Sequence, residues 1–144
     1  MASLLTFEEA QERVLGFARP LPAEPVPIAE AAGRVAAEDA RALVDLPPFA
    51  SSAMDGFAMR AADLPATLPI VGESAAGRPY EGRLEPGSAV AISTGAVVPE
   101  GADAVVPVER VVQTENKVEI AQVPEPGAHV RPRGGDVATG ELVV

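Results

Sequence analysis

Apolar residues near the N-terminus recur with the period of a helix. They stand three or four positions apart, at Phe7, Ala10, Val14 and Phe17. This spacing places them on one face of a helix. Thr6 and Glu9 form a capping box, in which each side chain bonds a free backbone N–H of the first turn. Because Gly16 and Pro20 close the segment, the pattern predicts an amphipathic helix over residues 6–18.

The chain after this helix changes character at its prolines. Residues 19–27 hold four of them, and proline supplies no N–H group to a helix or a central strand. An extended, polyproline-like connector is expected there. Alanines favour a short helix over residues 28–32, and Gly33 interrupts it. An extended segment is expected over residues 34–44.

From Pro47 onward, short apolar runs alternate with glycine and proline turns. Valine, isoleucine and threonine dominate these runs, which predicts a compact β domain. A hairpin is expected with its turn at residues 115–117, so that Val118 and Ile120 point to one face of its second strand. Residues 128–144 have room for two short strands. The predicted fold class is α+β and predominantly β.

Composition excludes several kinds of site. The chain of 144 residues has no cysteine, which excludes disulfides, thiolate zinc sites and cysteine nucleophiles. His129 is the only histidine, so a metal site with several histidine ligands is excluded as well. The formal charge of −10 and the aromatic content of 3% oppose binding to nucleic acid, which needs a basic surface and aromatic stacking.

The sequence also lacks the patterns of membrane attachment and secretion. No uninterrupted apolar run approaches the roughly 20 residues of a transmembrane helix. The N-terminus reaches acidic residues within a few positions and has no basic start followed by an apolar stretch. We therefore expect no membrane partner and a cytoplasmic location.

The densest polar cluster lies in residues 47–60. Ser51 and Ser52 offer hydroxyl groups, and Asp55 stands directly before Gly56, a pair that permits a tight turn with positive φ. A carboxylate thrust out on such a loop suits metal binding or the orientation of a substrate. The alternative is a plain turn in which Asp55 bonds its own backbone.

A second cluster follows an apolar run that is expected to form a strand. The N–H groups of Ser93, Thr94 and Gly95, with the two hydroxyls, are able to form a small anion-binding concavity. The alternative is a strand-end turn in which serine and threonine cap loose N–H groups. The segment is not a P-loop, because the G-x-x-x-x-G-K-[ST] pattern does not occur and Lys117, the only lysine, lies elsewhere.

A third cluster lies at residues 129–136. Arg131 and Arg133 fall on the same side of an extended chain, and guanidinium groups suit phosphate or carboxylate. The alternative is that both arginines pair with local acids. For His129 the sequence offers no partner nucleophile, so a structural role is expected.

These clusters, in this order and spacing, resemble the molybdopterin molybdotransferase (MoeA) family, which includes the C-terminal domain of gephyrin. The matching segments are Pro47–Phe49, Ser52–Ala58, Thr94–Ala96, Pro99–Val106, and Gly134 with Asp136. The two longest strings together are far more specific than either alone.

The resemblance implies an elongated, dimeric fold. Residues 1–46 and 127–144 would form a discontinuous N-terminal domain of helix and extended segments, and residues 47–126 an inserted compact β domain. A downstream α/β catalytic domain and a C-terminal β domain would be absent from this chain. The chain stops at Val144 in the middle of an apolar pattern, which also indicates a fragment of a longer protein.

The resemblance further implies an activity. The complete enzyme takes adenylylated molybdopterin and molybdate, hydrolyses the adenylate in a metal-dependent step that uses Mg²⁺, inserts molybdenum into the dithiolene and releases AMP. A second copy of the same chain is the implied protein partner. Without the α/β domain, this fragment is expected to be inactive alone.

Roles for individual residues follow from the resemblance. Asp55 and Thr94 match the motif residues implied as catalytic, and Asp55 is the implied metal ligand. Asp55 is able to hold Mg²⁺ or a bound water, and Thr94 to hydrogen-bond oxyanions of molybdate or phosphate. The implied substrate-binding residues are Ser52, Gly56, Ser93 and Gly95.

Two points stay open. Gly135 stands where the family has an acidic residue, so the role of the neighbouring Asp136 is undetermined. The alternative function is a non-catalytic dimerisation or scaffold module, in which Asp55 and Thr94 serve only their turns.

Overall fold

A computed structural model describes residues 4–144 of the chain. Its contacts divide the chain into two units, Met1–Asp39 and Ala40–Val144. Each unit is described by itself. In the described residues no helix is long and apolar enough to cross a bilayer.

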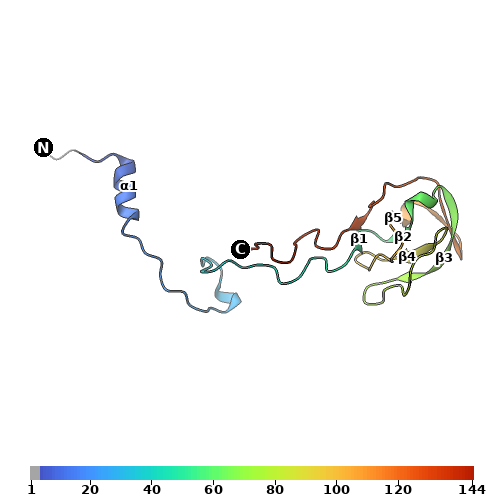
Figure 1. The fold of residues 1–144 in the computed structure, drawn as a ribbon, viewed down its shortest axis with the longest axis horizontal. Helices are drawn as coiled ribbons and strands as arrows, with labels where there is room; N and C mark the ends of the chain where they lie inside the picture. The colour runs from blue at the N-terminus through green and yellow to red at the C-terminus, as the bar shows by residue number, and fades with distance from the viewer. Residues whose placement is uncertain (1–3) are drawn as a thin grey trace. The chain divides into compact units, whose positions relative to one another are not determined.

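The first unit contains helix α1, Phe7–Leu15 (Figure 1). The predicted capping box is present: Glu9 N–H donates to Thr6 Oγ1 at 3.2 Å, and Thr6 N–H donates to Glu9 Oε2 at 2.8 Å. The predicted end at residue 18 is wrong, because Gly16 already caps the helix and its N–H bonds the carbonyl of Glu12. The helix therefore has only nine residues.

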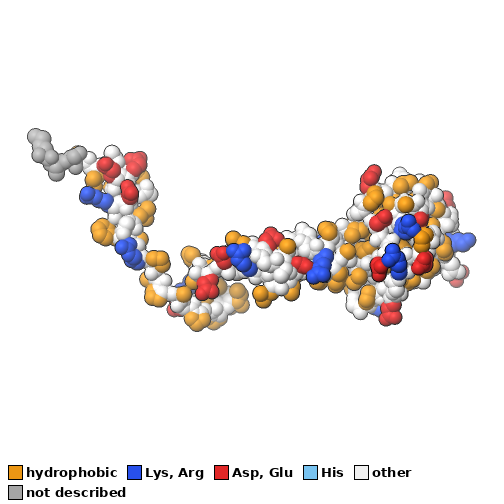
Figure 2. Space-filling view, in the orientation of Figure 1, with side chains coloured by type: hydrophobic (Ala, Val, Ile, Leu, Met, Phe, Trp, Pro, Cys, Tyr) orange, Lys and Arg blue, Asp and Glu red, His pale blue; other side chains and the backbone are white. Residues whose placement is uncertain are grey.

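The predicted apolar face of α1 is exposed within the described chain. Phe7, Val14 and Phe17 are 76%, 70% and 84% exposed. Beyond the helix, residues 19–27 carry no regular structure, as expected for the proline-rich connector. The predicted helix over 28–32 is a single 3₁₀ turn, Ile28–Glu30. Figure 2 shows apolar side chains on the surface along this part of the chain.

The second unit is built on a curled six-stranded sheet with strand order β5-β2-β4-β3-β7-β6. Its strands in chain order are β2 Gly56–Met59, β3 Ala66–Ser74, β4 Ala89–Ile92, β5 Ala104–Pro107, β6 Val112–Gln113 and β7 Lys117–Ile120. Neighbours are antiparallel except for β3 and β4, which are parallel. Residues 4–144 contain three 3₁₀ turns: η1, Ile28–Glu30, in the first unit, and η2, Ala61–Asp63, and η3, Val108–Arg110, in the second. The predicted β domain is thus present.

The predicted hairpin is confirmed. Strands β6 and β7 pair antiparallel, with Gln113 opposite Val118. Val118 and Ile120 are 0% and 1% exposed, while Glu119 between them faces solvent. The alternation read from the sequence therefore separates the buried face from the exposed one.

A second, two-stranded sheet joins β1, Ser51–Ser52, to β8, Val130–Arg131. Sequence reasoning placed two strands in residues 128–144, but only β8 forms. The rest of that segment makes isolated bridges, Val137 to Leu46 and Leu142 to Arg41. The segments at residues 41–46 and 137–142, which lie before and after the β-rich part in the sequence, therefore run antiparallel to each other.

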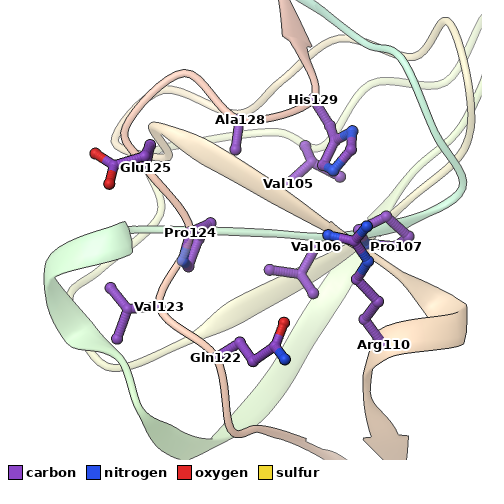
Figure 3. A pocket seen from close by; sticks show the side chains of 10 residues that line it. All are labelled: Val105, Val106, Pro107, Arg110, Gln122, Val123, Pro124, Glu125, Ala128 and His129. Atoms are coloured by element: carbon purple, nitrogen blue, oxygen red, sulfur yellow. The ribbon is translucent and has the colours of Figure 1, made fainter.

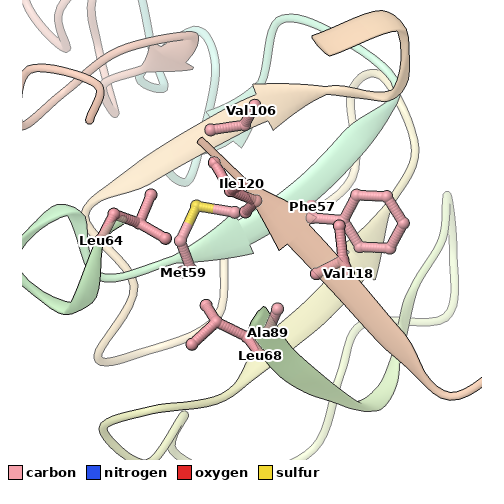
Figure 4. Close-up of a cluster of buried hydrophobic side chains, with 8 residues drawn as sticks. All are labelled: Phe57, Met59, Leu64, Leu68, Ala89, Val106, Val118 and Ile120. Atoms are coloured by element: carbon pink, nitrogen blue, oxygen red, sulfur yellow. The ribbon is translucent and has the colours of Figure 1, made fainter. Parts of the chain in front are cut away.

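The core lies on both faces of β2, whose four residues are all buried. Phe57 and Met59 point to one side and Ala58 to the other, because successive strand residues alternate. Figure 4 shows the larger cluster, which is made by Phe57, Met59, Leu64, Leu68, Ala89, Val106, Val118 and Ile120. The smaller cluster contains Ala58, Ile92, Ala96 and Val105. Burial of these side chains holds β2 and its flanking loop in place.

Candidate functional site

Asp55 and Thr94 are brought into direct contact by the sheet. Asp55 lies on the loop between β1 and β2, and Thr94 follows β4. Because β2 and β4 are antiparallel with Gly56 opposite Ile92, the two loops emerge at the same end of the sheet. The Thr94 N–H donates to Asp55 Oδ1 at 2.7 Å, and the Thr94 hydroxyl donates to the same oxygen at 2.9 Å.

This contact favours the ionised form of Asp55. The backbone N–H of Thr94, followed by its hydroxyl, lowers the pKa of Asp55 below its usual value, while desolvation works against them. Both side chains are exposed. Oδ2 of Asp55 accepts no hydrogen bond from residues 4–144. The site thus presents a carboxylate whose Oδ1 is held by two hydrogen bonds and whose Oδ2 is available to a ligand.

Ser52 joins the loop between β1 and β2 to the loop that follows β4. Its side chain is buried, and its hydroxyl donates to the Met54 carbonyl at 2.5 Å and accepts from the Met54 N–H at 3.2 Å. Its backbone N–H donates to the carbonyl of Ala96 at 3.0 Å, and its carbonyl accepts from the Gly95 N–H at 2.8 Å. The position of Asp55 relative to Thr94 is therefore set by backbone bonds as well as by the side chains.

The N–H groups of the loop at Thr94 are all occupied within the chain. Ser93 N–H bonds the Ser74 carbonyl at 3.0 Å, and Ala96 N–H bonds the Ser93 carbonyl at 3.0 Å. Thr94 bonds Asp55, and the Gly95 N–H is taken as described above. The four N–H groups of residues 93–96 are therefore all bonded within the chain.

Two glycines shape the loops. A Cβ on Gly56 would lie 2.1 Å from the carbonyl oxygen of Val106, so no other residue fits there without moving the backbone. Gly95 has φ +79, a left-handed conformation that side chains disfavour. Both glycines thus hold the geometry around Asp55 and Thr94.

The third cluster pairs with acids, as the simpler interpretation expected. Arg131 forms an ion pair with Asp136, and Arg133 Nε donates to Asp45 Oδ2 at 2.6 Å. The expectation that both arginines lie on one side of an extended chain is wrong, because a turn over residues 132–135 sends them to different partners.

Asp45 was missed by sequence reasoning. Its Oδ1 accepts from the N–H and the hydroxyl of Thr139, both at 2.8 Å. These bonds, together with Arg133, lower the pKa of Asp45 to about 2. The one signal available was the Thr139-Gly140 pair, which repeats the Thr94-Gly95 pair.

His129 sits in a turn with φ 55, and its carbonyl accepts the Ala53 N–H at 2.9 Å. Its side chain lines a pocket of about 220 Å³ beside β5, together with Val105, Arg110 and Pro124 (Figure 3). None of the predicted site residues lines this pocket. The Asp55–Thr94 pair lies instead at an open surface.

The donor set around Asp55 fits a shared Mg²⁺ site and not a self-contained one. No group of three or more histidine, aspartate or glutamate side chains in the described part of the chain is placed to hold a metal ion. Mg²⁺ in phosphate chemistry commonly takes one or two carboxylates and completes its octahedron with water and phosphate oxygens. Asp55 Oδ2 is suited to be one such ligand.

Comparisons with known proteins agree on one family. Residues 5–144 match the family model described as MoeA N-terminal region (domain I and II). A molybdopterin molybdenumtransferase of Haemophilus influenzae is 38% identical over 145 residues, which cover 98% of this chain and 36% of the relative. Molybdopterin molybdenumtransferase 2 of Mycobacterium tuberculosis is 43% identical over 126 residues, or 83% of this chain and 31% of the relative.

Solved structures give the same result. The crystal structure of a molybdopterin biosynthesis MoeA protein from Pyrococcus horikoshii superposes with a TM-score of 0.75 at 36% identity, covering 97% of this chain and 38% of the other. The chain therefore spans about a third of the length of these relatives.

Proposed function

The chain belongs to the MoeA N-terminal-region family, and on that premise we propose that it forms the N-terminal portion of a molybdenum cofactor biosynthesis enzyme. The reaction of the whole enzyme inserts molybdenum from molybdate into adenylylated molybdopterin and releases AMP. The chain spans about a third of its relatives' length, and its proposed contribution to that enzyme is one wall of the active site.

One observation carries the proposal. Asp55 and Thr94 are 39 positions apart, yet both donors of Thr94 converge on one oxygen of Asp55 at an exposed surface. The Asp45–Thr139 pair also joins distant loops, but Arg133 occupies its second carboxylate oxygen, whereas Asp55 Oδ2 accepts no hydrogen bond from residues 4–144. An ionised carboxylate with one open oxygen is suited to a metal ion or a donor of a bound substrate.

Asp55 would be the ligand that this chain provides to Mg²⁺. When bound, the ion would neutralise charge on phosphate oxygens during cleavage of the adenylate. The chain's own contribution is to keep the carboxylate ionised and oriented. Thr94 does this through its N–H and hydroxyl, and Ser52 through its backbone bonds to the second loop.

The exposed apolar residues support a second copy of the chain as the partner. On the first unit, Phe7, Leu21 and Ile28 are 76%, 89% and 92% exposed. Large apolar side chains in such numbers on a surface are typical of protein–protein contacts. A homodimer that covers them is part of the proposal, and the cytoplasm is its proposed location.

The scaffold function is the competing candidate, and the position of Asp55 and Thr94 outside the pocket beside β5 favours it. The two candidates differ in what a change at Asp55 does. If the chain is only a scaffold, loss of the Asp55 carboxylate leaves catalysis unchanged.

A chimera tests the proposal: residues 1–144 joined to the remaining part of the Haemophilus influenzae relative. Its rate of AMP release and cofactor formation from adenylylated molybdopterin and molybdate is measured. We expect the chimera to be active and Asp55→Ala to abolish activity while folding and dimerisation persist. Full activity of Asp55→Ala would favour the scaffold function, and an inactive but folded chimera would count against the proposal.

A further inference from the structure

We propose that Thr94 is a positioning residue that holds Asp55 Oδ2 toward a cationic ligand, and that Thr94 itself makes no contact with an oxyanion. This inference rests on the proposed function, because it concerns which residue of the same site faces the cation and which faces the oxyanion. It differs from the role in which Thr94 hydrogen-bonds molybdate or phosphate. The hydrogen-bond donors of residues 93–96 distinguish the two roles.

Thr94 has two protons to donate, and both are used. Its N–H lies 2.7 Å and its hydroxyl oxygen 2.9 Å from Asp55 Oδ1. A hydroxyl carries a single proton, so what remains on Thr94 Oγ1 is lone pairs, which only accept. Molybdate and the unprotonated oxygens of a phosphate have only acceptors as well. Thr94 is therefore able to bind an oxyanion only if it releases Asp55.

Releasing Asp55 is unfavourable for two reasons. Hydrogen bonds to an ionised carboxylate are stronger than bonds between neutral groups. An oxyanion that replaced the carboxylate as the acceptor would also lie beside a second negative charge, which repels it. The locked pair thus resists the exchange that direct oxyanion binding requires.

The neighbouring groups leave a single alternative donor on this loop. The N–H groups of Ser93, Gly95 and Ala96 are bonded to backbone carbonyls. The Ser52 hydroxyl is buried and already bonds Met54. Among the donors of residues 93–96, only the Ser93 hydroxyl makes no hydrogen bond with the described residues. Ser93 is therefore the matched control for a contact with an oxyanion.

The same chain shows what the second oxygen of such a pair attracts. Asp45 is locked by Thr139 through the same two donors, and its Oδ2 bonds the Arg133 guanidinium at 2.6 Å. At Asp55 the equivalent oxygen has no cation from residues 4–144. A cation from outside the chain is the ligand that completes the second pair in the way that Arg133 completes the first.

Hydrogen exchange on the chain itself tests the lock without any activity. We expect the Thr94 amide to be protected in the wild-type chain and to lose protection in Asp55→Ala. The Gly95 amide, which bonds the Ser52 carbonyl, serves as the internal control and keeps its protection. Addition of sodium molybdate or inorganic phosphate should leave the Thr94 amide protected. Fast exchange in the wild-type chain, or deprotection by either anion, would overturn the inference.

Kinetics of the chimera distinguish a role of Thr94 in binding the cation from a role in binding the oxyanion. For Thr94→Val we expect the Mg²⁺ concentration at half-maximal rate to rise by about 10- to 100-fold, as for other partners that orient a metal ligand. The KM for molybdate should stay unchanged, and Thr94→Ser, which keeps both donors, should restore the wild-type Mg²⁺ requirement. Ser93→Ala removes a hydroxyl that does not contact Asp55, so a raised KM for molybdate with an unchanged Mg²⁺ requirement in this variant is the pattern expected for the loss of an oxyanion donor.

The opposite pattern overturns the inference. If Thr94→Val raises the KM for molybdate and leaves the Mg²⁺ requirement unchanged, Thr94 contacts the oxyanion. Failure of the proposed function is recognised separately, because a wild-type chimera without activity leaves the hydrogen-exchange result intact.

Discussion

Two carboxylate–threonine pairs in this chain have the same local geometry and different surroundings. Asp45 with Thr139, and Asp55 with Thr94, each place two threonine donors on one carboxylate oxygen. The glycine after each threonine has a positive φ, +85 at Gly140 and +79 at Gly95. The first carboxylate has Arg133 on its other oxygen and a side chain only 19% exposed. The second is exposed and open.

The role of each pair therefore depends on what lies against the second carboxylate oxygen. With Arg133 in place, the first pair is complete and ties the chain near residue 45 to the chain near residue 139. Without an arginine, the second pair keeps an ionised oxygen available for something outside the described chain. Identical local chemistry thus serves structure in one place and, by our proposal, catalysis in the other.

The largest expected contrast lies in activity. In the chimera, Asp55→Asn should lower the rate by roughly 100- to 1,000-fold, as for removal of a group that stabilises charge at a reacting centre. Asp45→Asn removes the same charge from the closed pair and should leave the rate within about threefold of wild type, because the second oxygen of Asp45 is already bonded to Arg133 and is not available to a ligand. Equal losses in both variants would show that the open oxygen has no special role.

The second contrast concerns the glycines beside the two pairs. Gly56→Ala should destabilise the fold by about 3 kcal/mol or more, because its Cβ would collide with the Val106 carbonyl. Gly134→Ala, next to Asp45, meets no atom closer than 3.5 Å and costs only its left-handed backbone. That cost is about 1–2 kcal/mol. Urea unfolding of the two variants measures both, and a larger loss for Gly134→Ala would contradict the packing argument.

The third contrast is the acid dependence of stability. Folding lowers the pKa of Asp45 from its usual 3.8 to about 2, so the folded state prefers the ionised form. Its stabilising contribution is complete above pH 3.8 and is lost as the pH falls toward 2. The melting temperature of Asp45→Asn should therefore lie below that of wild type at neutral pH and converge with it in acid. The lowered pKa of Asp55 gives the same sign, with a weaker effect because no arginine assists. A constant difference between Asp45→Asn and wild type at every pH would show that the effect is not ionic.

The smallest contrast is between the two threonines. Thr139→Val should lower the melting temperature slightly, because it removes one bond to a carboxylate that joins distant parts of the chain. Thr94→Val should change the melting temperature less, since its carboxylate is exposed and the loops are already joined by the backbone of Ser52. Thermal melts followed by circular dichroism measure both, with Thr→Ser at each position as the control. A larger fall for Thr94→Val would assign the open pair to structure.

Local patterns were read correctly where the deciding interactions are local. The capping box of Thr6 and Glu9 joins residues three positions apart, and the alternation of Val118 and Ile120 follows from the strand itself. The resemblance also directed attention to Asp55 and Thr94. It did not reveal that both donors of Thr94 are spent on Asp55, because that depends on the register of β2 against β4.

Errors arose where a local pattern needed a distant partner. The apolar repeat around Phe7 predicted an amphipathic helix, and nothing in the described chain covers the apolar face of that helix. The strand β1 has only two residues, Ser51 and Ser52, and exists because β8 pairs with it. Asp45 went unnoticed because Thr139 stands 94 positions away.

The amino-acid sequence by itself determined the capping box of the N-terminal helix, the β-rich character of the chain after Pro47, the hairpin of β6 and β7, and which residue types are available for chemistry. Periodicity and turn propensity act between near neighbours, so they can be read along the chain. The tertiary structure alone decided which carboxylate receives an arginine and which keeps a free oxygen. That choice depends on the folding of remote loops to within hydrogen-bond distance of each other, and such proximity is a property of the packed sheet and not of any single segment.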